Sequence, residues 1–113
     1  MEMSLLFLYN GLRRMNKAFE VIDHTADVGI IAYGADIEEL FSNAAIALFS
    51  LITELGSIEN KFHIDLEVSS QDIDTLIIEW LNELIYLFDV KHILLNRFDI
   101  RSLTNNELKA TCY

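Results

Sequence analysis

The sequence of 113 residues has no proline, four glycines and a single cysteine, Cys112. A lone cysteine excludes an intramolecular disulfide and a cysteine-based metal cluster, which fits a reducing cytoplasm. Cys112 falls in a predicted strand, so we interpret it as a small hydrophobe rather than a nucleophile. No apolar run is long enough to cross a bilayer. Because 52% of the residues are apolar, we expect one domain with a sizeable core. The short apolar runs and the lone cysteine lead us to expect that this domain is soluble and cytoplasmic.

Basic residues are also scarce, with 8 Lys and Arg against 18 Asp and Glu and a formal net charge of −10. Between residues 18 and 90 the only Lys or Arg is Lys61. Nucleic-acid affinity depends on neutralising phosphates, so this composition argues against direct nucleic-acid binding. The acidic surface could serve solubility alone or contact a basic partner surface, and the composition leaves both open.

The first residues differ in character from the rest. Residues 5–8 are apolar, but the run is too short for a signal peptide and Arg13 and Arg14 follow it instead of preceding it. We therefore expect residues 1–18 to be an N-terminal extension outside the core, with Met15 as a candidate start. The folded domain is then expected to span residues 19–113.

Strands are predicted where β-branched and aromatic residues cluster or alternate with polar ones. The predicted strands are 19–22, 28–33, 62–68, 93–100 and 107–113, with a turn at 104–106 between the last two.

Two helices are predicted from apolar residues at helical spacing. The first follows Asp36, which stands three residues before Glu39 in a capping-box-like pattern, and should end near 53–56. The second has Ser69, Ser70 or Asp72 as its cap, and Trp80 on its apolar face is interpreted as core. The order β-β-α-β-α-β-β predicts an α+β two-layer sandwich, a mainly antiparallel sheet with two helices on one face.

A polar cluster, Asp23-His24-Thr25-Ala26-Asp27, separates the first two predicted strands. Carboxylates this close together could supply part of a hard-cation site or tune a proton. Asp and Thr also satisfy the backbone of turns, and the residues alone favour that role. His63 and His92 are interpreted as solvated, because no other ligand residues are spaced to join them.

Three segments resemble one known family. The run VIDHTADVGI at residues 21–30 resembles the opening signature of the archeases. The segment EELFSNAA at 38–45 is similar to the part that follows it in that family, and WLNELIYLFD at 80–89 is a second strong match. The resemblance covers residues 19 to about 112 in the same order.

The resemblance implies a small metal-binding accessory protein that is not itself an enzyme. Archeases activate a GTP-dependent RtcB-type RNA ligase in tRNA splicing and RNA repair, by promoting guanylylation of the ligase and its multiple turnover. The Asp at the position of Asp27 is a ligand for a divalent cation in that family, usually calcium. Asp23 and His24 match the motif as lesser candidates. The ligase would then hold the RNA, which agrees with the acidic composition.

The family's remaining strands and a second metal-ligating Asp have no counterpart before Tyr113, so the archease-like domain is expected to be incomplete at its C-terminus. Calcium takes roughly six to eight oxygens, so we expect weak cation binding, on the order of millimolar. An uncovered sheet edge is expected to favour self-association. Two other functions stay open: a chaperone-like interaction module independent of metal, and a small metal-dependent hydrolase using Asp23, His24 and Asp27.

Overall fold

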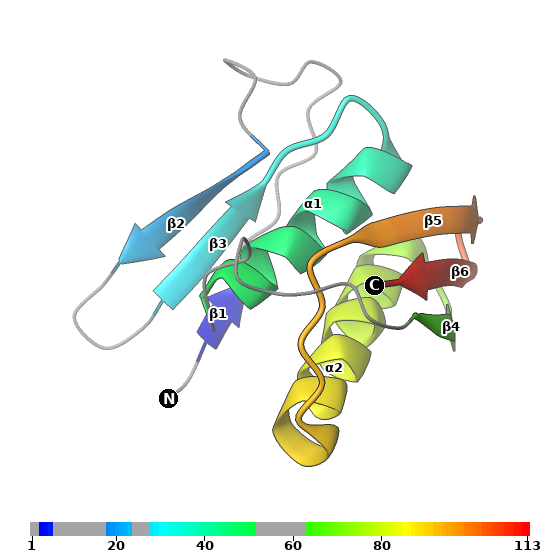
Figure 1. Cartoon of the computed structure of the whole chain (residues 1–113). Helices are drawn as coiled ribbons and strands as arrows, with labels where there is room; N and C mark the ends of the chain where they lie inside the picture. Colours follow the sequence, from blue (N-terminus) through cyan, green and yellow to red (C-terminus); the bar gives the residue numbers. More distant parts are fainter. Residues whose placement is uncertain (1–2, 6–17, 24–27, 52–62) are drawn as a thin grey trace. The chain divides into compact units, whose positions relative to one another are not determined.

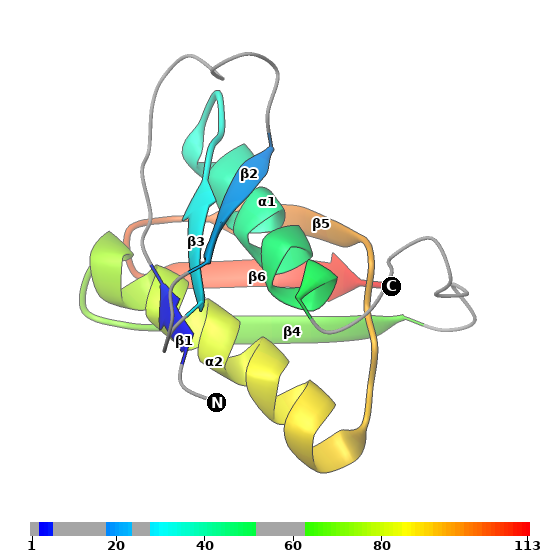
Figure 2. The ribbon, with the colours of Figure 1, turned by 90° about the vertical axis from the view of Figure 1, so that its left-hand side faces the viewer.

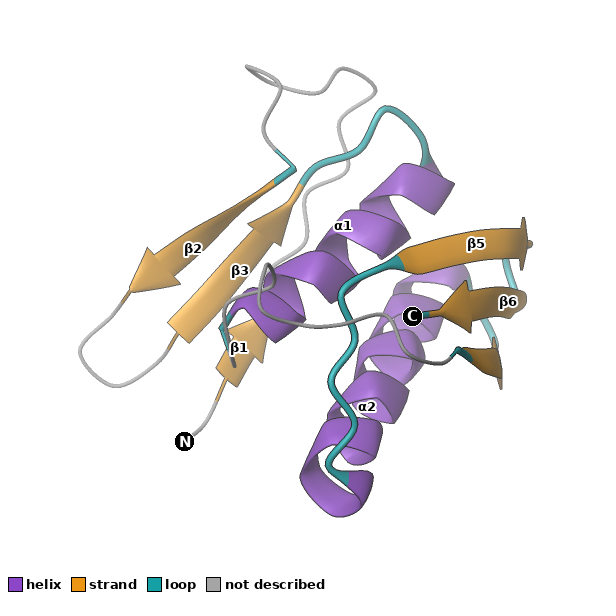
Figure 3. Cartoon of the chain, viewed as in Figure 1, coloured by secondary structure: helices purple, strands orange, loops and turns teal. Residues whose placement is uncertain are grey.

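The computed structural model describes residues 3–5, 18–23, 28–51 and 63–113 (Figure 1). Its helices and strands are β1 (Met3–Leu5), β2 (Phe19–Asp23), β3 (Val28–Ala32), α1 (Ile37–Ser50), β4 (Ile64–Ser69), α2 (Ile73–Lys91), β5 (Phe98–Leu103) and β6 (Glu107–Cys112). From β2 onward this is the predicted order β-β-α-β-α-β-β, so the α+β class is confirmed (Figure 3). Strand β1 precedes that series and was not predicted. No helix in the described ranges has the length and apolarity needed to cross a membrane.

The chain divides into two compact units, Met1–Leu48 and Phe49–Tyr113. Each unit contains a three-stranded sheet, with strand order β1-β3-β2 in the first and β4-β6-β5 in the second. All neighbouring strands are antiparallel except the parallel pair β1–β3, so the mainly antiparallel arrangement is confirmed. The strands form two sheets where a single sheet was expected. Alternation along a strand assigns its faces, but it does not say which strands pair.

Helix α1 begins as the sequence predicts. The Asp36 carboxylate accepts a hydrogen bond of 2.7 Å from the Glu39 N–H, and Glu39 Oε1 accepts one of 3.4 Å from the Ala35 N–H. The apolar face predicted for this helix consists of Ile37, Leu40, Phe41, Ala44, Ala45, Leu48 and Ile52, the last of which lies outside the described residues. Ala47 and Phe49 are buried as well, so the buried side of the helix is wider than predicted. The predicted end at 53–56 lies outside the described residues.

Helix α2 packs on β4 and β6 within the second unit (Figure 2). Asp72 is its N-cap, and the Asp72 carboxylate accepts a hydrogen bond of 2.8 Å from the Thr75 N–H. That bond holds the pKa of Asp72 below its ordinary value. Trp80 is fully buried, as predicted, and its ring meets the ring of Phe98 edge-on at 6.1 Å between centroids.

The C-terminal end of α2 corrects the predicted strand 93–100, because β5 begins only at Phe98. His92 adopts the left-handed conformation at φ 57°, and its N–H donates to the Phe88 carbonyl at 3.0 Å. The Ile93 N–H then donates to the Leu87 carbonyl at 3.0 Å. This pattern of two bonds closes the last helical turn. Residues 93–97, predicted as the start of a strand, instead connect the end of α2 to β5.

The turn between β5 and β6 lies where the sequence predicts it. The Thr104 N–H donates to the Glu107 carbonyl at 2.9 Å, and the Thr104 hydroxyl oxygen accepts from the Glu107 N–H at 3.0 Å. Asn106 ties this turn to the loop before α2, because its side-chain amide donates to the Gln71 carbonyl at 2.8 Å. The register shifts between Ile100 and Ser102, which leaves Arg101 as the extra residue of a bulge in β5.

Candidate functional site

The polar cluster 23–27 stands at one end of the β2–β3 hairpin. Asp23 pairs with Val28 as the last pair of a five-residue antiparallel register, and residues 24–27 join the two strands. Asp27 is therefore the residue directly before β3. His24 and Asp27 lie outside the described residues, and of Asp23 only the backbone is described. The assignment of Asp27 as a metal ligand stays a prediction.

The other end of this hairpin is joined to α1 by a buried hydrogen bond. The ladder continues past Phe19 and Ala32, since the Tyr33 N–H donates to the Ala18 carbonyl at 2.9 Å. The Tyr33 carbonyl in turn accepts a bond of 2.7 Å from the side-chain amide of Asn43, which is only 6% exposed. Sequence reasoning missed Asn43. The available signal was a polar side chain next to the apolar stripe of α1.

Gly34 makes the sharp passage from β3 into α1 possible. A Cβ at this position would overlap the Leu40 nitrogen and would lie 2.8 Å from both the Leu40 Cα and the Asp36 carbonyl oxygen. All of these are main-chain atoms that cannot swing aside, so only glycine fits. Gly34 and Asn43 together fix the root of the hairpin whose opposite end carries the polar cluster.

No other part of the described structure offers a ready ligand set. In residues 3–5, 18–23, 28–51 and 63–113, no three His, Cys, Asp or Glu side chains come together in a way that could hold a metal ion. His63 and His92 are exposed, as expected from the sequence. The His63 ring lies 5.9 Å from that of Tyr113, a contact between rings and not a ligand geometry.

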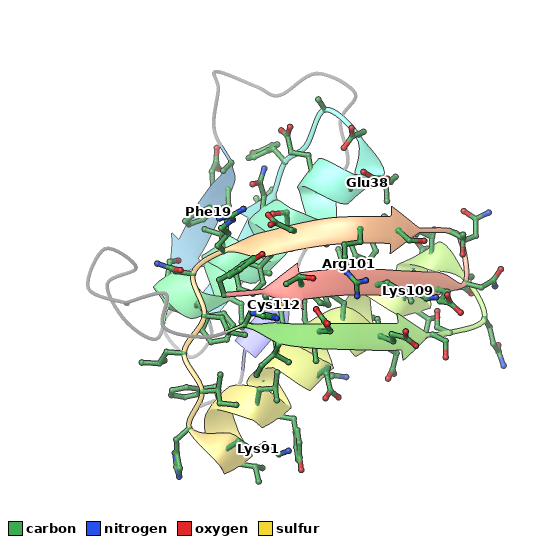
Figure 4. The ribbon with its side chains drawn as sticks, turned by 45° about the vertical axis from the view of Figure 1, so that its right-hand side comes forward. Phe19, Glu38, Lys91, Arg101, Lys109 and Cys112 are labelled. Carbon is green, nitrogen blue, oxygen red and sulfur yellow. The ribbon has the colours of Figure 1, made fainter. Side chains whose placement is uncertain are left out.

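The face of the second sheet that points away from α2 carries charged side chains (Figure 4). The Asp65 carboxylate accepts a bond of 2.8 Å from the Thr111 hydroxyl, and Asp99 forms an ion pair of 2.9 Å with Arg97. Lys109 lies 4.0 Å from Glu67. The contacts of Asp65 with Thr111 and of Lys109 with Glu67 join β4 to β6, and the Arg97–Asp99 pair lies within one stretch of chain at the start of β5, so we assign all three to the sheet and not to a ligand site.

Cys112 is fully buried in the second unit. Burial, followed by the nearby charges of Asp65 and Asp99, raises the pKa of its thiol to about 12. A thiol with that pKa is protonated at neutral pH and is a poor nucleophile. The interpretation of Cys112 as a small hydrophobe is confirmed.

Comparison with known proteins assigns the family. The family model for the Archease protein family (MTH1598/TM1083) matches residues 19–113. The chain belongs to the archease family. A protein archease from Sulfolobus acidocaldarius is 38% identical over 96 residues, which is 84% of this chain and 69% of that protein. One from Methanothermobacter thermautotrophicus is 40% identical over 85 residues, 75% of this chain and 61% of that protein.

A solved structure supports the same assignment. The solution structure of Methanobacterium thermoautotrophicum protein 1598 is similar with a TM-score of 0.71 at 35% identity, over 84% of this chain and 70% of that one. The chain spans 62% of the length of the protein archease from Methanosarcina mazei, which is 34% identical to it. The resemblance seen in the sequence motifs is thereby confirmed at the level of the family.

Proposed function

We propose that this chain is an archease-type accessory protein for an RNA ligase. It binds a divalent cation, calcium in the first instance, and activates a GTP-dependent RtcB-type ligase in tRNA splicing and RNA repair in the cytoplasm. The family match over residues 19–113 is the observation that carries this proposal. The acidic composition supports it, because an accessory protein with a net charge of −10 leaves the RNA to the ligase.

Asp27 is the proposed cation ligand, with Asp23 and His24 as lesser candidates from the same segment. The backbone pair Asp23–Val28 supports this choice, because it brings the two ends of the segment together at the end of a hairpin. Carboxylate oxygens suit calcium, although two carboxylates provide fewer oxygens than the ion prefers. A bound divalent cation would supply positive charge that stabilises phosphate groups. The role of this chain is then to hold the ion at the end of the β2–β3 hairpin, which is joined to α1 at its other end.

Terbium luminescence and calcium calorimetry test the cation site directly. We expect affinity on the order of millimolar for the unaltered chain, and its loss in Asp27→Ala. Asp74→Ala is the matched control, because Asp74 is an exposed acid on α2. The cation affinity of this variant should equal that of the unaltered chain. Equal binding by Asp27→Ala would remove the assigned ligand, and micromolar calcium affinity would contradict the weak site.

The ligase itself tests the function. The chain is added to the cognate RtcB-type ligase with GTP and a divalent cation, and the number of ligation turnovers per ligase is measured. We expect multiple turnover only when the chain is present. Turnover that is identical with and without the chain contradicts the proposed function.

A chaperone-like interaction module is the second candidate, and one edge of the second sheet favours it. The Ser70 N–H donates to the Asn106 carbonyl at 2.9 Å, which fixes the alternation of the β4–β6 ladder. Asp65 and Glu67 therefore direct their backbone N–H and C=O groups away from β6. No strand among the described residues pairs with that side of β4. An extended segment of another protein could add there, and suppression of aggregation in unrelated clients without metal would support this alternative.

A further inference from the structure

Most of the exposed large apolar side chains among the described residues lie on α2. Four large apolar residues are exposed among the described residues: Ile78 at 49%, Tyr86 at 45%, Val90 at 56% and Leu94 at 38%. Three lie on α2 and the fourth lies three residues beyond its end. Single exposed apolar residues scattered over a surface are ordinary, so the arrangement of these residues along one helix is what points to an interaction surface.

Three of these residues, together with the polar Asn82, form a ridge along the helix. Ile78, Asn82, Tyr86 and Val90 follow one another at intervals of four. Rows of this spacing are the ridges that fit into the grooves of a neighbouring helix. The core is served by a different side of α2, formed by Leu76, Ile77, Trp80, Leu81, Leu84 and Leu87. The ridge therefore adds nothing to the fold that the buried side does not already supply.

Acidic side chains flank the ridge. Asp74, Glu79 and Asp89 are exposed and, at 3.6 residues per turn, fall on the same half of the helix. The sequence has no Lys or Arg from Ile73 to Val90, and Lys91 stands at the end of α2 with its Nζ 6.0 Å from the centre of the Tyr86 ring. We call this surface the outer face of α2; it consists of Asp74, Ile78, Glu79, Asn82, Tyr86, Asp89 and Val90.

We propose that the outer face of α2 is the surface through which the chain docks on the ligase, against a helix whose apolar stripe is flanked by Lys and Arg. The inference rests on the proposed function. An enzyme that binds RNA needs basic residues along the path of the RNA, and these complement the acidic flanks. The same acidic residues repel RNA, so the outer face of α2 contacts the ligase itself and not the RNA that the ligase binds. A second copy is disfavoured, because its identical face would bring like charges together.

A single titration of the ligase with this chain distinguishes a loss of docking from a loss of activation. A docking surface sets the concentration of the chain at which the ligase is half-maximally stimulated, whereas a cation ligand sets the maximum. Loss of the ridge therefore raises the half-maximal concentration and leaves the plateau unchanged. Asp27→Ala has the opposite signature, with a lower plateau.

The central variant is the double substitution Ile78→Gln with Val90→Gln. Gln is a better helix former than Ile or Val, so α2 stays folded. We expect the half-maximal concentration for ligase guanylylation to rise by about tenfold or more, because two apolar contacts are lost. The matched control, Ile78→Leu with Val90→Leu, keeps an apolar side chain at both positions and should behave as the unaltered chain.

The dependence of docking on ionic strength tests the role of the acidic residues that flank the ridge. Glu79→Gln with Asp89→Asn should weaken the dependence of the half-maximal concentration on ionic strength. Glu107→Gln removes the charge of an exposed acid at the start of β6 and is the control, with an unchanged salt dependence.

The outcomes are distinct. If the unaltered chain fails to stimulate the ligase at any concentration, both the proposed function and the docking surface are wrong. If the chain stimulates and the double Gln variant matches it in half-maximal concentration, the docking surface alone is wrong. If the variant instead changes only self-association in analytical ultracentrifugation, the face pairs with a second copy and the proposal is likewise contradicted.

Discussion

The side-chain amide of Asn43 donates a hydrogen bond of 2.7 Å to the carbonyl oxygen of Tyr33, and this buried contact joins α1 to the root of the β2–β3 hairpin. The same hairpin carries the pair Asp23–Val28 at its other end. The bond therefore links the core of the first unit to the segment that holds the proposed cation ligand.

Replacing Asn43 should weaken the fold. Asn43→Ala removes a buried hydrogen bond, and we expect the free energy of unfolding to fall by about 1–3 kcal/mol. Urea denaturation measures the change. Asn82→Ala removes the same side chain from an exposed position of α2 and should stay within about 0.5 kcal/mol of the unaltered chain. Equal effects of the two variants would contradict the role of Asn43.

The N-cap of α2 should make stability depend on pH. The Thr75 N–H lowers the pKa of Asp72 in the folded chain below the value of about 3.9 expected when unfolded. The stabilisation is then fully present above the unfolded pKa and is lost as the pH falls through the folded pKa. The melting temperature of Asp72→Ala should lie below that of the unaltered chain at neutral pH and converge with it in acid. A constant difference down to the lowest pH would contradict the ionised cap, and Asp72→Asn, which keeps a capping oxygen, should lose less at neutral pH.

A glycine at the end of α2 should stabilise the chain. His92 occupies the left-handed region at φ 57°, which costs an L residue about 1 kcal/mol relative to glycine. His92→Gly should raise the free energy of unfolding by about that amount, measured by urea denaturation. Lys91→Gly places the same residue in helical backbone one position earlier and should lower it by about 1 kcal/mol. Destabilisation by His92→Gly would contradict the helix end described above.

The open side of β4 should allow self-association. Sedimentation velocity over increasing protein concentration should reveal it, more strongly at high salt, because salt screens the repulsion between the acidic edges. The Glu67 N–H points away from β6, so Glu67→Pro should block association while the sheet stays intact. In Val68→Pro the lost N–H belongs to the β4–β6 ladder, and the sheet should unfold. A chain that stays monomeric at all concentrations and salts would contradict this prediction.

The order of elements was predictable because it rests on local signals. Asp36 and Asp72 cap their helices through bonds to residues three positions later, and such contacts are readable from sequence. The end of α2 was not readable, because the left-handed residue is His92 and not the usual glycine. The parallel pairing of β1 with β3 and the division into two sheets are non-local, and alternation along a strand carries no information on them.

The candidate site was predictable only in part. The motif around Asp27 pointed to the archease family, and the comparisons confirm that membership. The hydrogen bond that joins the hairpin to α1 was missed, because the Asn43 side chain bonds to the carbonyl of Tyr33, ten residues away in the sequence. The outer face of α2 was also missed, since the sequence alone does not tell an exposed apolar residue from one that widens the core stripe.

The most direct test of the proposed function is guanylylation of the cognate RtcB-type ligase, measured with saturating amounts of the unaltered chain or of Asp27→Ala. The unaltered chain should increase the rate at which the ligase is guanylylated, and Asp27→Ala should lower that plateau while its melting temperature stays unchanged. Equal plateaus for the two chains would contradict the role of Asp27. A rate that the unaltered chain does not increase would contradict the account as a whole.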